Sequence, residues 1–273
     1  MRPSTSKSSM SRCLAGIAAL GLVLISSVAN AEWCAPGVKR QPPHPLTGET
    51  CPLVGSMGGA KLAIPTEYLL GPAAYKGIDI WSAESFAKTP KHPTFSSEID
   101  NFAIKIRQSN FKPIESASDF SDYIRSYNAV KTLPPPDNRW IHVGFGTRYY
   151  PTSAKEVAER WHEDEAHWGP YERAANVWGL AHFVSVQQPS TNIPGDQVEY
   201  FYSLADDSTF IFCRSTLMKV PPHDLLTRCE INFDVPQIKA RAEVTNIRDK
   251  ADLARWREIE AGVLGVAGSF IVQ

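Results

Sequence analysis

The amino-acid sequence predicts an α+β fold, mainly antiparallel sheet with packed helices, in which a C-terminal helix lies on a β-meander and two disulfides strengthen the whole. Apolar and polar side chains alternate in residues 229–235 and again in residues 238–244. This period of two is typical of neighbouring antiparallel strands with one buried face. Residues 253–270 instead space their apolar side chains three or four apart, as in a helix that packs on that face.

Residues 1–31 have the three parts of a secretory signal peptide. Basic residues up to Arg12 precede an apolar core from Leu14 to Val28, and Ala29-Asn30-Ala31 forms a small-x-small cleavage site. The core is short for a membrane span, and an uncleaved anchor helix is the alternative. Removal of residues 1–31 from the 273-residue chain leaves 242 residues, enough for one large domain or two small ones. We expect a periplasmic or secreted protein with no stable membrane insertion after cleavage.

The charges are nearly balanced, with 28 basic and 29 acidic side chains and a formal net charge of −1. A protein that binds a phosphate backbone needs an excess of basic side chains to neutralise it. The composition therefore argues against nucleic acid as a partner.

Four cysteines follow the signal segment, and an even number in an exported chain indicates two disulfides. Three pairings are formally possible. We favour the local ones, Cys34 with Cys51 and Cys213 with Cys229, and the second would stabilise the fold by about 3 kcal/mol. A zinc site is the alternative, but the short C-x2-C spacing that zinc knuckles use is absent.

The first half of the mature chain begins with a Pro- and Gly-rich segment, residues 32–59, which reads as an extended lead-in. Strands are predicted at residues 61–65, 77–81 and 101–107, followed by a helix at 119–130 that Ser118 caps. Residues 134–137, three prolines and an aspartate, then interrupt the pattern. They divide the chain into an N-terminal half, residues 32–136, and a C-terminal half, residues 137–273, unless the two form one continuous domain.

The second half contains further strands at residues 139–148, 180–186 and 197–204, and with the C-terminal pair they predict a meander of about five strands. Ser153, with Glu156 three residues on, marks the start of a helix that continues through residue 161 or 168. Because proline cannot adopt a positive φ, Pro236 predicts a longer, bulged turn between the last two strands.

Three glycines, Gly262, Gly265 and Gly268, lie inside the predicted C-terminal helix. Each costs about 1 kcal/mol of helix propensity relative to alanine. We expect a close approach of this helix to the sheet to compensate for that cost.

A histidine- and glutamate-rich segment, W-H-E-D-E-A-H-W at residues 161–168, looks at first like a zinc-protease helix. Its two histidines are five apart, whereas ligands on one helical face need a spacing of four. Glu163 and His167 do have that spacing, and Glu159 lies one turn earlier. No third histidine is evident nearby, so a solvated helix face of mixed charge is favoured over a metal site. No G-x-S-x-G serine-nucleophile motif is present, and we identify no catalytic residue. We also expect no cofactor.

Aromatic side chains are concentrated between residues 140 and 178, which hold four of the seven tryptophans. Most are expected in the core, but exposed ones would anchor a protein partner or stack on a glycan. The candidate binding residues are Tyr149, Tyr150, Trp161, Trp168, Tyr171 and Arg173.

Four segments carry a resemblance to a known group of proteins. They are I-P-T-E-Y-L (64–69), W-G-L-A-H-F (178–183), F-I-F-C with R-C-E-I-N-F (210–213 and 228–233), and W-R-E-I-E-x-x-V with S-F (256–263 and 269–270). With them the chain resembles exported bacterial proteins that include periplasmic immunity proteins against type VI secretion lipase effectors. The resemblance implies a protein partner, a toxic effector, which the chain binds and blocks without catalysis of its own. It identifies no binding residue.

Two other classes of function stay open from the sequence. One is a cell-envelope hydrolase, metal- or carboxylate-dependent, with Glu163 and His167 as participants. The other is a structural component of the envelope.

Overall fold

The computed structural model describes residues 34–273, apart from residues 42, 45–46, 80–81, 129–138, 152, 164–170, 186–196, 218–224 and 249. The signal segment and the predicted boundary at residues 134–137 lie outside these residues. The strands are β1 (Leu53–Met57), β2 (Ala60–Ile64), β3 (Ala74–Tyr75), β4 (Ile99–Arg107), β5 (Trp140–Gly146), β6 (Tyr171–Val177), β7 (Leu180–Ser185), β8 (Gln197–Ser203), β9 (Phe210–Leu217), β10 (Leu225–Val235) and β11 (Ala240–Ile247). The helices are α1 (Ala83–Phe86), α2 (Ala117–Asn128), α3 (Ala154–Glu163) and α5 (Trp256–Ser269).

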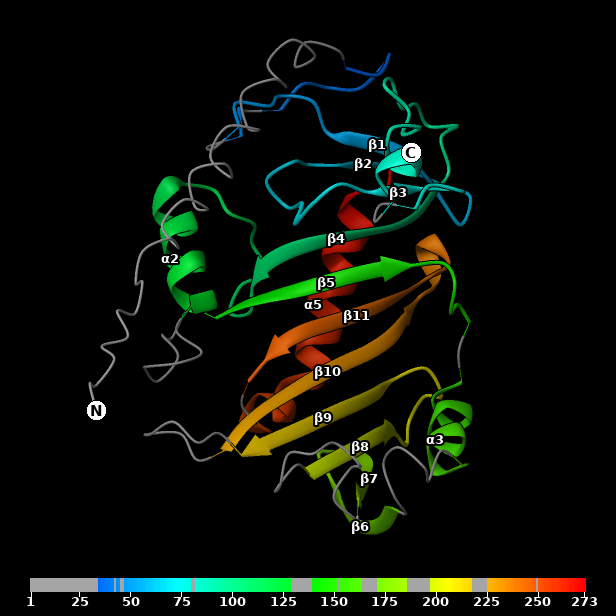
Figure 1. Ribbon diagram of the computed structural model, residues 1–273, viewed down its shortest axis with the longest axis vertical. Coiled ribbons are helices and arrows are strands. Elements are labelled where there is room, and N and C mark those ends of the chain that lie inside the picture. Colours follow the sequence, from blue (N-terminus) through cyan, green and yellow to red (C-terminus); the bar gives the residue numbers. More distant parts are fainter. Residues whose placement is uncertain are drawn as a thin grey trace, which may run out of the picture.

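Nine of the strands form one antiparallel sheet in the order β3-β4-β5-β11-β10-β9-β8-β7-β6 (Figure 1). Strands β6 to β11 follow one another as a meander, and β5 and β4 then extend the sheet from β11. The predicted fold class is confirmed. The predicted meander of about five strands differs from the observed one in its members. Residues 139–148 form β5, which pairs with β11 outside the meander. Strand β6 was not predicted, because only its first residue is fully buried and it lacks the alternation that marks a strand in sequence.

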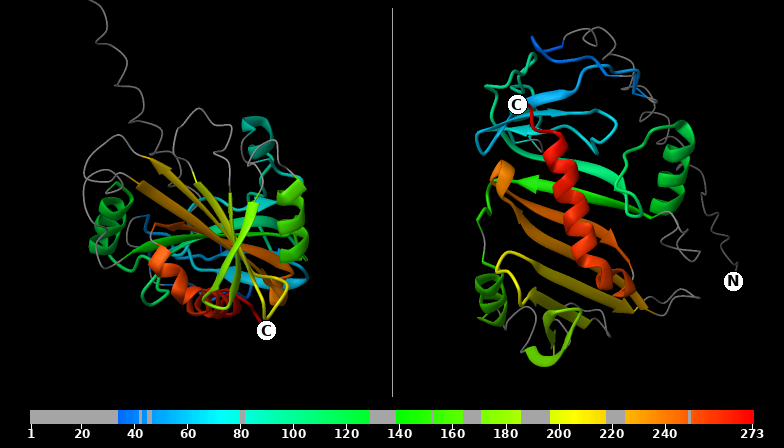
Figure 2. Two further views of the ribbon diagram at one scale, coloured as in Figure 1. Left: turned by 90° about the horizontal axis from the view of Figure 1, so that it is seen from below. Right: turned by 180° about the vertical axis from the view of Figure 1, so that it is seen from behind.

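Helix α5 crosses one face of this sheet, as the view from behind shows (Figure 2). Its buried side chains recur at helical spacing, as the sequence predicted: Trp256, Ile259, Val263 and Ala267, with Leu253 and Phe270 just beyond its ends. Burying one large apolar side chain contributes about 1.5–3 kcal/mol, so this stripe is a main source of the core's stability. On the opposite face, none of the helices in the described residues runs along the middle strands (Figure 1).

The two predicted disulfides, Cys34–Cys51 and Cys213–Cys229, are both present. Cys213 and Cys229 stand directly opposite each other on β9 and β10, and both are buried. The bridge therefore joins neighbouring strands beneath α5 in the main core.

Strand β1 was not expected, because the lead-in segment was read as extended chain without a partner. It pairs with β2 in a two-stranded hairpin. The C-terminal residues continue this small sheet, since the Ala63 amide donates to the Phe270 carbonyl at 2.9 Å and the Val272 amide to the Lys61 carbonyl at 2.9 Å. The hairpin thus ties the end of α5 to the start of the described chain.

Two local predictions in the first half were wrong. Residues 77–79 form no strand, because Gly77 has φ +76° and lies in the turn after β3. Helix α2 begins two residues earlier than predicted, and the Ser116 hydroxyl oxygen, not that of Ser118, accepts from the Asp119 amide at 3.1 Å. The Ser153 cap of α3 is confirmed by its hydrogen bond from the Glu156 amide at 3.2 Å.

In the C-terminal part, the predicted longer turn after Pro236 is confirmed. The residue with positive φ in this turn is Lys239 (+45°), not the proline. Strand β11 consequently starts at residue 240, not 238. The prediction for the three helix glycines was wrong as stated. Only Gly262 meets a close neighbour, and that neighbour is the ring of Phe111.

Candidate binding surface

The face of the sheet opposite α5 contains a hollow of about 1180 Å³. Strands β4, β5, β11, β10 and β9 form its floor, and the residues after β5 and helix α3 form one wall. Helices α2 and α3 lie at opposite ends of the strands and leave the middle of this face uncovered among the described residues (Figures 1 and 2). We call this feature the open-face hollow.

The floor of the hollow is low because two of its residues are glycines. Gly144 lies opposite Glu243 of β11 and Ala103 of β4 in the strand register. A Cβ built on Gly144 would meet nothing nearer than the Glu243 carbonyl oxygen at 4.0 Å, and one on Gly146 nothing nearer than the Asn101 Cβ at 3.9 Å. Glycine in a strand interior weakens the strand and often marks a place where a ligand approaches the backbone.

Two carboxylates, Glu230 of β10 and Glu243 of β11, line the hollow. Partial burial raises the pKa of Glu230, and the nearby charge of Glu243 raises it further. Neither side chain forms an ion pair or hydrogen bond with any residue that the structure describes. Arg148, Arg160 and Arg241 also line the hollow, but none of them forms an ion pair with either carboxylate.

Asn232 follows Glu230 by two residues on β10, lies directly opposite Glu243 of β11 and is only 8% exposed. Its neighbours in sequence, Ile231 and Phe233, are fully buried on the α5 side, so the Asn232 side chain points to the hollow, which it lines. Its amide has no hydrogen-bond partner among the described residues. Its side chain lines the hollow, so the amide is available to a group that binds there.

Arg241 also lines the hollow, but its guanidinium is already engaged. It donates to Asp234 Oδ1 at 3.2 Å and to the Ser208 carbonyl at 3.3 Å, and it lies 4.5 Å from the centre of the Phe210 ring. Burial lowers the pKa of Arg241, whereas the charge of Asp234 opposes that shift. We regard it as a fixed part of the wall.

The rim is aromatic and basic. Tyr149 is the most exposed large hydrophobic side chain of the described chain, at 62%, and the Arg148 guanidinium lies 5.3 Å from its ring centre. Val157 and Arg160 of α3 complete this side. Helix α3 is held in place because the Ala154 amide donates to the Asp207 carbonyl at 2.6 Å.

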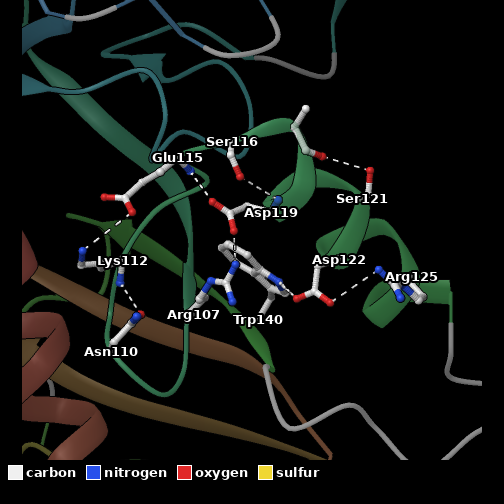
Figure 3. A network of polar contacts seen from close by, with 11 residues as sticks. Arg107, Asn110, Lys112, Glu115, Ser116, Asp119, Ser121, Asp122, Arg125 and Trp140 are labelled. Atoms are coloured by element: carbon white, nitrogen blue, oxygen red, sulfur yellow. Dashed lines mark hydrogen bonds and ion pairs between the residues drawn. The ribbon is translucent and has the colours of Figure 1, made fainter.

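A polar network fixes α2 beside the far end of the same face (Figure 3). Arg107 of β4 pairs with Asp119 of α2, and its guanidinium lies 4.8 Å from the Trp140 ring centre. The Trp140 indole N–H donates to Asp122 Oδ2 at 3.2 Å. These contacts hold α2 against β4 and β5 around the ring of Trp140.

The predicted binding residues do not gather at one place. Tyr149 is at the rim of the hollow, and Tyr150 follows it half-buried. Tyr171 is 8% exposed and packs edge-on against Tyr200, with ring centres 4.9 Å apart, in a small cluster of its own. Arg173 is exposed, with its guanidinium 5.4 Å from the Phe183 ring centre.

The remaining predicted residues lie beyond what the structure describes. Trp168 and His167 are outside the described residues, and the side chains of Trp161 and Glu163 are outside them as well. Within the described part of the chain, no group of three or more His, Cys, Asp or Glu side chains could hold a metal ion.

Sequence reasoning missed Glu230, Asn232, Glu243 and Gly144 as functional residues. The first three were assigned to the wet face of an antiparallel pair, which is where they lie. The available signal was the pair Gly144 and Gly146 within a strand, since two glycines on one face leave room above them.

In the comparisons with known proteins, one solved structure matches the chain. No protein-family profile matches the chain. No curated protein matches it by sequence. The chain is similar to the structure of an immunity protein of the Stenotrophomonas maltophilia type IV secretion system, with 13% identity and a TM-score of 0.49 over 88% of this chain and 100% of the other. Within the described residues, no helix is long and apolar enough to cross a membrane.

Proposed function

We propose that this protein is an exported binding protein of the immunity class, which blocks a toxic effector by direct contact through the open-face hollow. The observation that carries the proposal is the hollow itself. Among the described residues it combines an uncovered sheet face, two carboxylates without an ion-pair partner, the Asn232 amide without a hydrogen-bond partner, and the exposed Tyr149 at its rim.

Each of these features offers a contact that a partner covering the hollow can use. Interfaces draw most of their energy from a few buried aromatic and arginine side chains, which Tyr149 and Arg148 supply here. A polar side chain such as Asn232 adds specificity because a wrong partner leaves it unpaired. The two disulfides agree with folding in an oxidising compartment such as the periplasm.

The finer assignment is to an antibacterial effector of the type VI lipase class, on the strength of the sequence resemblance alone. The neighbour in the solved structures is described as an immunity protein of a type IV system. We therefore propose the immunity role first and the type VI lipase target second.

The test uses the oxidised mature protein and the exported protein encoded beside its gene. We expect a stoichiometric complex by calorimetry and loss of the toxic enzyme's activity on binding. Gly144→Leu, which fills the hollow where space is free, should abolish binding while the far-UV spectrum and melting temperature stay at wild-type level or above. Ala261→Leu adds the same side chain at an exposed position of α5 and serves as the control. Full binding by Gly144→Leu would show that the hollow is not the contact surface.

A carboxylate-dependent hydrolase is the second candidate, because Glu230 beside Glu243 has a raised pKa as a general acid requires. In this version of the hydrolase hypothesis, Glu230 and Glu243 take the catalytic roles that the sequence suggested for Glu163 and His167. Turnover of chromogenic glycosides or esters by the wild type, and its loss in Glu230→Gln, would support it. Equal background rates for the two proteins would exclude it.

A further inference from the structure

The open-face hollow carries a more specific inference about the partner, which rests on the proposed binding function. We infer that the partner inserts a lysine or arginine side chain into the hollow, with its cationic end beside Glu230 and Glu243 and a hydrogen bond to the amide oxygen of Asn232.

The first argument is charge. Glu230 and Glu243 come from adjacent strands and raise each other's energy, since each feels the negative charge of the other. The buried Arg241 interacts with Glu243 electrostatically, but its guanidinium hydrogen bonds go to Asp234 and Ser208. No base among the described residues forms an ion pair with either carboxylate. A cation brought by a partner would relieve this repulsion.

The second argument is the orphaned amide. Asn232 is 92% buried, counted from its 8% exposure, and lies in register between Phe210 on β9 and Glu243 on β11. Its side chain lines the hollow and has no partner in the described chain. An ammonium or guanidinium group carries several N–H donors, enough to reach the amide oxygen and a carboxylate together.

The third argument is shape. The low floor at Gly144 leaves depth for a long side chain, and Phe210 and Phe212 give the hollow apolar walls. Lysine and arginine bury an apolar stem while their charged end finds polar partners. An acidic or short polar side chain would meet the carboxylates without compensation.

The rim refines the choice of partner. Arg148 and Arg160 stand at the mouth of the hollow, on the side of α3. They repel an evenly basic surface, so the geometry fits a basic side chain that has acidic neighbours. Rim charges of this kind act mainly on association rate and on selectivity.

The experiment titrates the ¹⁵N-labelled mature protein with N-acetyl-arginine methylamide and N-acetyl-lysine methylamide. We expect saturable shifts of the Gly144 backbone amide and the Asn232 side-chain amide. N-acetyl-norleucine methylamide, with a similar stem and no charge, should leave both signals in place. The double variant Glu230→Gln/Glu243→Gln should weaken binding of the cationic probes about tenfold or more. That variant removes a repulsion, so we expect it to fold at least as stably as the wild type.

Absence of saturable shifts with both cationic probes would overturn the inference, as would equal binding of the norleucine probe. The partner complex separates this inference from the proposed function. Loss of partner binding in Gly144→Leu with full binding in Glu230→Gln/Glu243→Gln would keep the function and refute the basic anchor. Full partner binding in Gly144→Leu would refute the proposed surface, whereas the probe titration would still decide whether the hollow accepts a cation.

Discussion

Gly262 of α5 faces the ring of Phe111, and this contact makes a sharp test of the packing. A Cβ on Gly262 would lie 2.4 Å from two Phe111 ring atoms and 2.5 Å from a third. Real Cβ contacts do not come so close, so Gly262→Ala has to displace the ring. Forcing an extra methyl into a packed core costs about 1–3 kcal/mol. The gain in helix propensity returns about 1 kcal/mol. We therefore expect a net loss of about 1 kcal/mol in the free energy of unfolding.

Gly265 lies one turn further along the same helix and provides the matched control. Nothing stands within 4 Å of a Cβ built there, so Gly265→Ala should raise stability by about 0.5–1 kcal/mol. Urea unfolding followed by circular dichroism measures both. For a chain of this size, 1 kcal/mol corresponds to about 2–4 °C in melting temperature, so the two variants should shift in opposite directions.

Phe111→Ala then tests the cause. This variant is destabilised by itself, because the ring packs against the main core. In its background, however, Gly262→Ala should become stabilising, with a coupling energy of about 1–2 kcal/mol. If Gly262→Ala stabilises the wild type as much as Gly265→Ala does, the ring does not occupy this site and the packing derived for α5 is wrong.

Three further predictions concern stability. Replacing Cys213 and Cys229 by alanine should cost about 3 kcal/mol in urea unfolding, because their bridge closes a loop with a sequence separation of 16; no change in stability would contradict this. Burial, and next the charge of Asp206, raise the pKa of Glu260 from 4.5 to about 7, so the folded state binds its proton more tightly and stability falls as pH rises through that window. Partial exposure reduces the penalty above pH 7 to about 1–2 kcal/mol, so Glu260→Gln should be that much more stable than wild type at pH 8 and equal to it at pH 4; an equal gain at both values would refute the assignment. Ser153→Ala should lower the melting temperature by a few degrees, since the hydroxyl oxygen caps the third amide of α3 and such a cap contributes about 1 kcal/mol; an unchanged melting temperature would show that the cap is not formed in solution.

The alternation in residues 229–235 and 238–244 and the stripe from Leu253 to Phe270 were enough to predict the core of the fold. Both patterns report which side chains are buried, and burial follows from sequence wherever one face is dry. The pairing of the cysteines could also be predicted from the sequence, because the close spacing within each pair favoured local bridges. Strand β6 escaped prediction because an edge strand with mostly exposed side chains has no such pattern.

Less of the candidate site could be predicted from the sequence. Tyr149 was predicted as a binding residue from its place in an aromatic segment, and it lies exposed at the rim of the hollow. Tyr171 came from the same segment yet lies buried against Tyr200, because aromatic density does not indicate which side of a strand a ring occupies.

By itself, the sequence determined the C-terminal pair of alternating strands, the helix that packs on their dry face, and which cysteines join. Only the tertiary structure decided that β5, far from β11 in the chain, pairs with it and sets Gly144 opposite Glu243. The physical reason is that the alternation of apolar and polar residues shows which face of a strand is buried but not which strand lies beside it. The depth of a hollow and the meeting of charges depend on which strands become neighbours, and that is settled by the packing of the whole sheet.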